Sequence, residues 1–306
     1  MILNRLAIIP TALIVTAIAP RPGFAQQDAR TALLVTPRWV QERINDPKLV
    51  LLHVGERPEY DATHLPGARF IEMADLSAPR DTTPQARVLE MLPEPVLRER
   101  LAKLGVSDDS RIVVYFGKDW VSPATRIILA LDRAGFGDAT SLLDGGMPAW
   151  VAQGYATTKD VPPPREGKLS TLKIKANTVT GEWVRDNATK NGNKLIDGRA
   201  GVFYDGINPG GPRGFQKSGH IPGAASVPYT SVWTESNRLK STEELREIFT
   251  KAGVKPGDTV VGYCHIGQQA TAMLFAARAL GFNAVLYDGS FEDWAYRDWP
   301  VESTKR

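Results

Sequence analysis

Apolar and polar positions in the C-terminal half of the chain change period several times, as strands alternating with helices require. Three short, β-rich apolar runs predict buried strands at residues 194–196, 259–263 and 284–287. A capping box at residues 241–244 opens one helix, and residues 270–280 form a second helical segment that ends at a glycine. This alternation predicts an α/β fold with a mainly parallel sheet and helices on both faces.

The pattern occurs twice along the chain. Three segments recur in the same order: 97–115 and 245–263, 64–68 and 220–224, and 144–150 and 288–294. The first pair keeps a constant spacing of 148 residues, since 245 − 97 and 263 − 115 agree. Such a repeat predicts two domains of the same architecture. We expect domain 1 at residues 31–155, domain 2 at residues 174–301, and an extended Pro-rich linker at residues 156–173.

The first residues have the pattern of an export signal. Arg5 precedes an apolar run over residues 6–19, and small residues follow at the positions that a signal peptidase reads. A membrane anchor is the alternative, but Pro10 interrupts a run that is shorter than the roughly 20 apolar residues of a span. We expect a signal peptide at residues 1–25, a mature chain from about Gln26, a periplasmic or secreted location, and no stable membrane insertion after cleavage.

Length and composition fit two ordinary globular domains. The chain has 306 residues, enough for two domains of roughly 130 residues, and 42% of its residues are hydrophobic. A net charge of +3 without a block of Lys or Arg predicts no nucleic-acid partner. Cys264 is the single cysteine, so no intramolecular disulfide can form. In an exported chain a lone thiol is either an inert core residue or a reactive one.

The surroundings of Cys264 favour the reactive alternative. The loop consists of Cys264, His265, Ile266, Gly267, Gln268 and Gln269, between a predicted buried strand and a predicted helix. Backbone N–H groups of such a loop, with the helix dipole, bind anions and favour thiolate over thiol. Gly267 supplies the conformational freedom of a tight loop. A thiolate held there can attack a sulfur donor and carry the sulfur as a persulfide, with no metal or organic cofactor.

Further motifs surround this loop. They are Asp197-Gly198-Arg199, residues 219–224, residues 263–269, Asp288-Gly289-Ser290 and Trp294. With these motifs in this order, the chain resembles the tandem-domain rhodanese family, which includes thiosulfate and mercaptopyruvate sulfurtransferases. The resemblance covers nearly everything after the predicted signal peptide. It implies two tandem rhodanese-like domains, of which domain 2 is catalytic, and a six-residue active-site loop that begins at Cys264.

Domain 1 lacks the residues that sulfur transfer needs. At equivalent positions it has Phe116 for Cys264, His53 for Asp197 and Gly55 for Arg199. Its loop, residues 117–123, is expected to be longer, because the spacing between the copies falls from 148 to 146 beyond it. We expect a non-catalytic domain that shields the cleft and, as the resemblance also implies, helps to shape the substrate entrance.

The loop sequence leaves the sulfur donor open. His265, Gln268 and Gln269 match neither the small Gly-Ser-Gly type of mercaptopyruvate users nor the cationic type of thiosulfate users within the family. Thiosulfate is favoured, because amide N–H groups and a nearby cation can hold a small dianion. Phe203 stands where the family often has an arginine that grips the substrate, and Arg213 is the candidate replacement.

Two neighbouring groups have alternative roles. Asp197 and Arg199 either form an ion pair that braces the loop, or Arg199 contacts the substrate directly. His265 either raises the thiolate fraction of Cys264 when it is protonated, or faces solvent. His220, in its Gly-His-Ile-Pro-Gly turn, is expected to hydrogen-bond the backbone rather than to take part in catalysis.

Three other kinds of function are alternatives to sulfur transfer by an enzyme. A cysteine phosphatase needs an arginine six residues after the nucleophile, where this chain has Ala270. A metal site is not expected, because the four histidines show no ligand spacing and there is no second cysteine. A persulfide relay or binding protein is the rival from another class, since its loading chemistry is the same. The expected partners are a small-molecule sulfur donor and an acceptor such as cyanide or a thiol.

Overall fold

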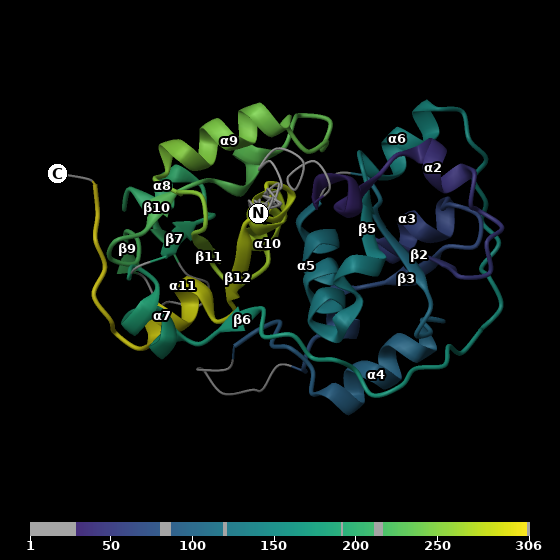
Figure 1. Ribbon diagram of the computed structural model, residues 1–306, viewed down its shortest axis with the longest axis horizontal. Coiled ribbons are helices and arrows are strands. Elements are labelled where there is room, and N and C mark those ends of the chain that lie inside the picture. Colours follow the sequence, from purple (N-terminus) through teal and green to yellow (C-terminus); the bar gives the residue numbers. More distant parts are fainter. Residues whose placement is uncertain (1–28, 80–86, 119–120, 191, 211–216, 305–306) are drawn as a thin grey trace, which may run out of the picture.

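Two five-stranded parallel sheets, one in each half of the chain, form the frame of the computed structural model (Figure 1). The structure describes residues 29–79, 87–118, 121–190, 192–210 and 217–304. Helices cover both faces of each sheet, and an apolar cluster lies on each covered face. The predicted α/β class with two similar domains is therefore confirmed.

Both sheets have the same strand order. Across the sheet of domain 1 the strands are β1 (Leu34–Val35), β5 (Thr140–Leu143), β4 (Arg111–Phe116), β2 (Leu49–Val54) and β3 (Arg69–Ile71). Across the sheet of domain 2 they are β6 (Thr178–Val179), β12 (Asn283–Tyr287), β11 (Thr259–Tyr263), β7 (Asn193–Asp197) and β10 (Ala225–Ser226). Neighbouring strands are parallel, so their carboxyl ends meet at one edge of each sheet. The central strands, β4 and β11, are equivalent. A separate antiparallel pair is formed by β8 (Pro209–Gly210) and β9 (Lys217–Ser218).

The helices lie between the strands in sequence, as the alternating pattern predicted. In domain 1 they are α2 (Pro37–Gln41), α3 (Arg57–Ala62), η1 (Met73–Leu76), α4 (Glu94–Lys103), α5 (Val121–Leu131), η2 (Asp132–Phe136), η3 (Gly137–Ala139) and α6 (Gly146–Ala152). In domain 2 they are α7 (Gly181–Asn187), α8 (Gly201–Tyr204), η5 (Tyr229–Val232), α9 (Thr242–Lys251), α10 (Gln269–Ala279) and α11 (Ser290–Tyr296).

Most elements predicted in domain 2 have the expected bounds. Strand β11 covers the predicted residues, and Ser241 and Glu244 make both hydrogen bonds of the capping box that opens α9. The helix after the cysteine loop begins at Gln269, one residue earlier than the pattern indicated, and ends at Ala279. Strand β7 extends to Asp197, which therefore stands at the carboxyl edge of the sheet.

The loop of domain 1 differs from the expectation. Helix α5 begins at Val121, so Ser122 and Pro123, which were expected in the loop, form the first turn of the helix. Proline is tolerated there, because the first N–H groups of a helix have no intrahelical partner. Helices α5 and α10 have 11 residues each, but α5 begins two positions earlier relative to the repeat, so the expected loop bounds of 117–123 were wrong.

Helices α5 and α10 pack against each other between the two sheets (Figure 1). Nearly every residue of α5 is buried, on all sides of the helix, including the polar Ser122, Thr125 and Arg126. One apolar cluster continues through this contact, from Val114 in domain 1 to Ile196 in domain 2. The two domains therefore share a core.

Equivalent residues of the two domains meet across this contact. The Oγ1 atoms of Thr125 and Thr271 are 2.8 Å apart, Gln268 Nε2 donates to Ser122 Oγ at 3.1 Å, and Arg278 pairs with Asp132 at 3.4 Å. The members of each pair are 146 residues apart. The two domains therefore pack about an approximate two-fold axis, in the manner of the isologous interface of a homodimer.

The segment between α6 and β6 runs along the surface of domain 1, past α4 (Figure 1). Thr158 pairs with His64 as an isolated bridge, and Gly167 donates its N–H to Ala102 O at 2.8 Å. Further along, Ser170 donates its hydroxyl to Asp108 at 2.7 Å. The Pro-rich connection is therefore an extended strap fixed to domain 1.

The predicted signal peptide, residues 1–25, lies outside the described residues. None of the helices in the described ranges is long and apolar enough to cross a membrane. Export of the chain therefore stays a prediction.

Candidate active site

Cys264 directly follows β11, the central strand of domain 2, and its side chain is fully buried. Its backbone N–H donates to Ser290 Oγ at 3.2 Å, and that hydroxyl donates to Tyr287 O at 2.9 Å. Ser290 has a φ of 54°, a left-handed conformation that costs an L-residue roughly 1 kcal/mol. The backbone at Cys264 is thus fixed from the next strand end, and its sulfur is shielded from solvent.

The first carbonyls of the loop are bound by the start of α11. Phe291 N–H donates to Cys264 O at 3.0 Å, and Glu292 N–H donates to His265 O at 3.0 Å. These N–H groups have no partner within their own helix, because they belong to its first turn. The same contact therefore satisfies the helix end and fixes two peptide groups of the loop.

The later carbonyls of the loop have other donors. Arg126 Nη1, from α5 in domain 1, donates to Gly267 O at 3.1 Å. Thr271 donates both its N–H, at 3.0 Å, and its hydroxyl, at 2.6 Å, to Gln268 O. Gly267 has a φ of 82°, and a Cβ built on it would lie 2.6 Å from Asp288 O. Glycine is required at this turn by both its conformation and the close backbone approach.

These contacts bind four carbonyl groups of the loop, those of Cys264, His265, Gly267 and Gln268. In a trans peptide the C=O and the following N–H point in opposite directions, so each following N–H points away from the group that binds its carbonyl. No acceptor within the described part of the chain binds the backbone N–H groups of residues 265–269. This row of free donors, which we call the N–H cradle, has the form of an anion-binding nest.

Asp197 and Arg199 form a buried ion pair beside the loop. Arg199 Nη2 lies 2.6 Å from Asp197 Oδ2 and 2.7 Å from Gly219 O, and the guanidinium stacks 3.9 Å from the ring centre of Phe291. Burial alone would lower the pKa of Arg199, but the Asp197 carboxylate outweighs it and raises that pKa. The ion pair considered for these two residues is observed, and a direct contact of Arg199 with substrate stays a prediction. Nη1 of Arg199 is buried and has no hydrogen-bond partner among the described residues.

His265 is a neutral side chain. Burial and, to a smaller extent, the positive charge of Arg199 lower its pKa to about 4. An imidazolium beside Cys264 is therefore disfavoured near neutral pH, which argues against that alternative. The ring does not simply face solvent either, because it packs edge-on against Phe203 with 4.6 Å between ring centres. Phe203 and His265 together form an uncharged wall next to the loop.

The remaining predicted loop residues have different surroundings. Ile266 and Gln269 are half-buried, and Gln268 is buried with its amide donating to Ser122 of domain 1. Arg213, the proposed replacement for the missing arginine, lies outside the described residues. His220 has the expected structural role, since its Nδ1 lies 2.8 Å from Tyr204 O and its ring stacks on Tyr204.

Sequence reasoning missed two residues that act on the loop. Ser290 was recognised only as part of a motif, and its contact with Cys264 depends on a backbone turn that the motif does not reveal. Arg126 comes from the other domain, 141 positions before the glycine that it binds. A single charged residue in a mainly apolar helix is the one signal that could have identified it.

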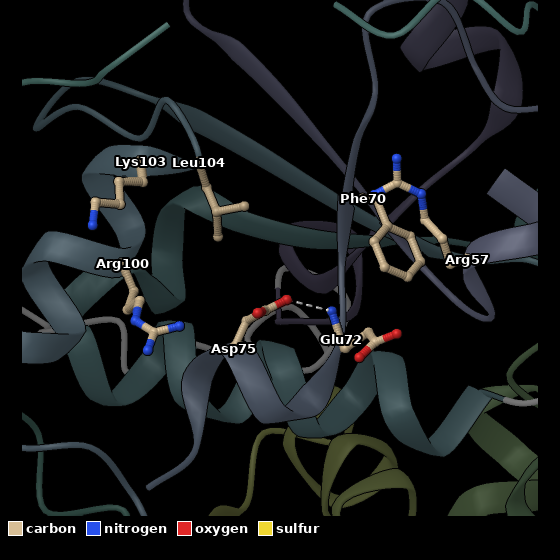
Figure 2. A pocket seen from close by; sticks show the side chains of 7 residues that line it. All are labelled: Arg57, Phe70, Glu72, Asp75, Arg100, Lys103 and Leu104. Carbon is tan, nitrogen blue, oxygen red and sulfur yellow. Dashed lines mark hydrogen bonds between the residues drawn. The ribbon is translucent and has the colours of Figure 1, made fainter. Parts of the chain in front are cut away.

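An open groove on domain 1 is a different feature. It has a volume of about 510 Å³ and its lining residues are Arg57, Phe70, Glu72, Asp75, Arg100, Lys103 and Leu104 (Figure 2). Arg57 is paired with Asp61 at 2.8 Å, and Asp75 accepts the Glu72 N–H at 2.8 Å. The groove contains no residue of the cysteine loop. No cluster of three or more metal-ligating side chains occurs in the ranges that the structure describes.

Both halves of the chain match a known protein family. The family model of the Rhodanese-like domain matches residues 36–153 and 180–297. The chain therefore belongs to the rhodanese-like family, with two such domains in tandem. Both matches agree with the resemblance seen in the sequence, and that prediction is confirmed.

Curated relatives cover nearly the full length of the chain. The thiosulfate sulfurtransferase of Rattus norvegicus is 32% identical over 285 residues, which cover 88% of this chain and 94% of the rat protein. The sulfur carrier protein TtuD of Thermus thermophilus is 29% identical (87% and 94% covered), and the 3-mercaptopyruvate sulfurtransferase of Rattus norvegicus 28% (87% and 93%). These relatives support a sulfurtransferase activity and differ in the substrates that their names give.

Solved structures show the same architecture. SseA from Escherichia coli, described as a "Rhodanese" fold, has a TM-score of 0.72 and 26% identity, and covers 84% of this chain and 98% of its own. EanB has a TM-score of 0.78 at 20% identity, over 91% of this chain and 70% of its own, a likeness of fold alone.

Proposed function

We propose that this protein is a thiosulfate sulfurtransferase that carries sulfur as a persulfide on Cys264. The Cys264 thiolate attacks the outer sulfur of thiosulfate; a new S–S bond forms, the bond within thiosulfate breaks, and sulfite leaves with its electron pair. Cyanide or a thiolate then attacks the outer sulfur of the persulfide. Thiocyanate or an acceptor persulfide is released, and the Cys264 thiolate is restored.

The observation that carries this proposal is the N–H cradle that follows Cys264. Four carbonyls of the loop are held by donors from α11, α10 and α5, which leaves the following N–H groups to bind anionic oxygens. The same donors stabilise the anionic persulfide after sulfite leaves. Burial is what an inert core cysteine would also show, so the orientation of these peptide groups is the feature that distinguishes Cys264.

Thiosulfate is the donor that suits the cradle best. It is small and dianionic, and N–H groups bind such anions without a fixed counter-charge of their own. Nη1 of Arg199, buried and without a partner among the described atoms, adds a cationic donor beside the loop. The rat thiosulfate sulfurtransferase is also a relative with 32% identity.

Mercaptopyruvate is a second candidate, favoured by one observation. Phe203 and the neutral His265 line the loop with an uncharged surface, which suits a donor with a single carboxylate better than a dianion. In that reaction Cys264 takes the thiol sulfur, and the enolate that leaves gains a proton to become pyruvate.

A persulfide relay without useful turnover on small acceptors is the third candidate. The similarity to a protein named a sulfur carrier favours it, as does the full burial of Cys264. Both features suit a thiol that a partner protein, rather than free cyanide, uncovers.

Intact-mass analysis tests these alternatives. The mature native protein and Cys264→Ser are each incubated with thiosulfate and with mercaptopyruvate. A gain of about 32 Da with thiosulfate, one sulfur atom on the thiolate, that is absent from Cys264→Ser supports the proposal. A gain with mercaptopyruvate alone selects the second donor, and loading without turnover on cyanide or thiols selects the relay. No gain from either donor refutes a sulfurtransferase that uses these substrates.

We also propose that the chain is exported, on the basis of the N-terminal charge, apolar run and small residues. The mass of the protein purified from an exporting host checks this. A chain that begins near Gln26 supports export, and a retained N-terminal segment contradicts it.

A further inference from the structure

Arg126 of domain 1 reaches across the domain contact to the catalytic loop of domain 2. Its side chain is 2% exposed, and Nη1 donates to Gly267 O at 3.1 Å and to Asp288 Oδ1 at 2.7 Å. Nη2 donates to Leu89 O. A guanidinium is suited to this position, because its planar fork can bind three acceptors at once.

The peptide that Arg126 binds belongs to the N–H cradle. With the carbonyl of Gly267 held toward α5, the N–H of the same peptide, which belongs to Gln268, points the other way. Of the other loop carbonyls, those of Cys264 and His265 are bound by the N-terminus of α11 and that of Gln268 by Thr271, all within domain 2. The Gln268 N–H is therefore the cradle donor whose peptide is bound directly by domain 1.

The two domains do not make this contact in both directions. At the spacing of 146 the residue equivalent to Arg126 is Ala272, so α10 has no cation at this position of the repeat. Asp144, the equivalent of Asp288, instead pairs at 3.4 Å with Arg238, whose side chain is 43% exposed. A buried bridge thus crosses to the cysteine loop, while a solvent-facing bridge crosses to the inert site of domain 1.

We propose that Arg126 is a positioning residue for sulfur transfer: it fixes the Gly267–Gln268 peptide so that the Gln268 N–H binds the anionic donor and the persulfide. The inert domain thereby supplies a part of the active site. This inference rests on the proposed function for the nature of the donor. It assigns Arg126 no direct contact with substrate.

The test compares Arg126→Met, Arg126→Lys and the matched control Arg238→Met in the mature two-domain chain. Arg126→Lys keeps the charge but replaces the fork by a single ammonium. Arg238→Met removes the other domain-crossing bridge at the non-catalytic site. Circular dichroism and urea denaturation first establish that each variant is folded.

The main readout is the ratio of the rates at which iodoacetate and iodoacetamide alkylate Cys264. Both reagents need the same thiolate and the same access, so their ratio isolates recognition of the iodoacetate carboxylate by the cradle. We expect both Arg126 variants to lower this ratio, and kcat/KM for thiosulfate, by about 10- to 100-fold, since a displaced donor costs this much. Arg238→Met should stay within about 2-fold, as expected of a surface bridge.

Three outcomes overturn the inference. The first is a native alkylation ratio in both Arg126 variants. The second is a native ratio in Arg126→Lys alone, which would assign the effect to charge, and the third is an equal loss in Arg238→Met, which would assign it to general weakening of the domain contact. The alkylation ratio needs no sulfur donor. A native protein that gains no sulfur from thiosulfate or mercaptopyruvate therefore refutes the proposed function, while the ratio still decides the role of Arg126.

Discussion

The two domains share one fold but differ in the residues that follow their equivalent central strands. After β11 stands Cys264, whose N–H donates to the hydroxyl of Ser290. After the same stretch of backbone in domain 1, β4 ends at Phe116, and the residue equivalent to Ser290 is Gly146. A Cβ built on Gly146 would lie 2.6 Å from the Phe116 ring. The ring therefore occupies the space that the serine side chain uses in domain 2.

The ion pair is also replaced in domain 1. His53 occupies the position of Asp197 and Gly55 that of Arg199, and both nitrogens of the buried His53 ring lack a hydrogen-bond partner among the described residues. Glu59 approaches the start of the following loop so closely that a Cβ on Gly117 would lie 2.3 Å from its Oε2. The sheet edge that carries the N–H cradle in domain 2 is occupied in domain 1 by the side chains of Phe116 and Glu59.

The difference shows that the frame and the chemistry depend on different residues. Both sheets keep the same order because the apolar faces of their strands and helices fix it. The carboxyl edge of each sheet is not constrained by this packing. At that edge domain 1 has the ring of Phe116 and glycines where domain 2 has polar groups. Its helix α5 retains a role through its contacts with α10 and with the cysteine loop.

The largest expected effect concerns the two strand ends themselves. Cys264→Ser should abolish both persulfide loading and turnover, because a hydroxyl is a far weaker nucleophile than a thiolate. The matched change Phe116→Leu should leave loading near the native level. Mass analysis after thiosulfate treatment measures both. Residual sulfur transfer in Cys264→Ser would show that domain 1 is not inert.

The next effect concerns the ion pair. Asp197→Asn leaves the buried Arg199 guanidinium without its carboxylate and should lower the free energy of unfolding by about 3–5 kcal/mol. His53→Phe, at the equivalent position, removes only unpaired nitrogens and should cost less than about 1 kcal/mol. Urea denaturation at pH 7 compares the two. Equal losses would mean that the pair contributes nothing beyond packing.

A smaller difference is expected at the positions of Ser290 and Gly146, which share a left-handed backbone. Gly146→Ala forces a methyl group against the Phe116 ring and should lower the free energy of unfolding by about 2–3 kcal/mol. Ser290→Ala has room for its Cβ and loses only hydrogen bonds, about 1 kcal/mol. If Gly146→Ala is tolerated equally well, the ring of Phe116 does not exclude a side chain there.

The smallest effect is a dependence of stability on pH. Burial lowers the pKa of His53 to about 4, whereas the unfolded chain titrates near 6.5. Between these values the unfolded state binds more protons, so stability falls as the pH is lowered. From pH 7 to pH 5.5 the loss due to His53 should be about 1 kcal/mol. Urea denaturation at the two pH values measures this loss, and His53→Phe should remove the part that is due to His53. A variant with the native pH dependence of stability would contradict the prediction.

Much of the fold followed from local patterns in the sequence. The bounds of β11, the capping box at Ser241 and the two-fold repeat were all predicted, since each depends on residue spacing along a few turns or one strand. The start of α5 at Val121 was not, because the change in spacing between the copies shows that residues were added but not which element received them.

The site was predicted in part for the same reason. Cys264 and its neighbours are contiguous in the sequence, and the Asp197–Arg199 pair lies within one turn of chain after a strand. The neutral state of His265 depends on its burial, part of which comes from Phe203, 62 positions earlier in the chain. Residue spacing along the sequence does not predict that contact.

By itself the sequence determined the elements, their duplication, the family and the position of Cys264 after a strand, because strand and helix periods and short motifs are local properties. Tertiary structure alone decided which way the peptide groups after Cys264 face. Their carbonyls are bound by α11, by Thr271 and by Arg126 of the other domain. Hydrogen bonds between segments distant in the chain form only when two sheets and the helices between them pack, so the direction of the cradle is a product of packing.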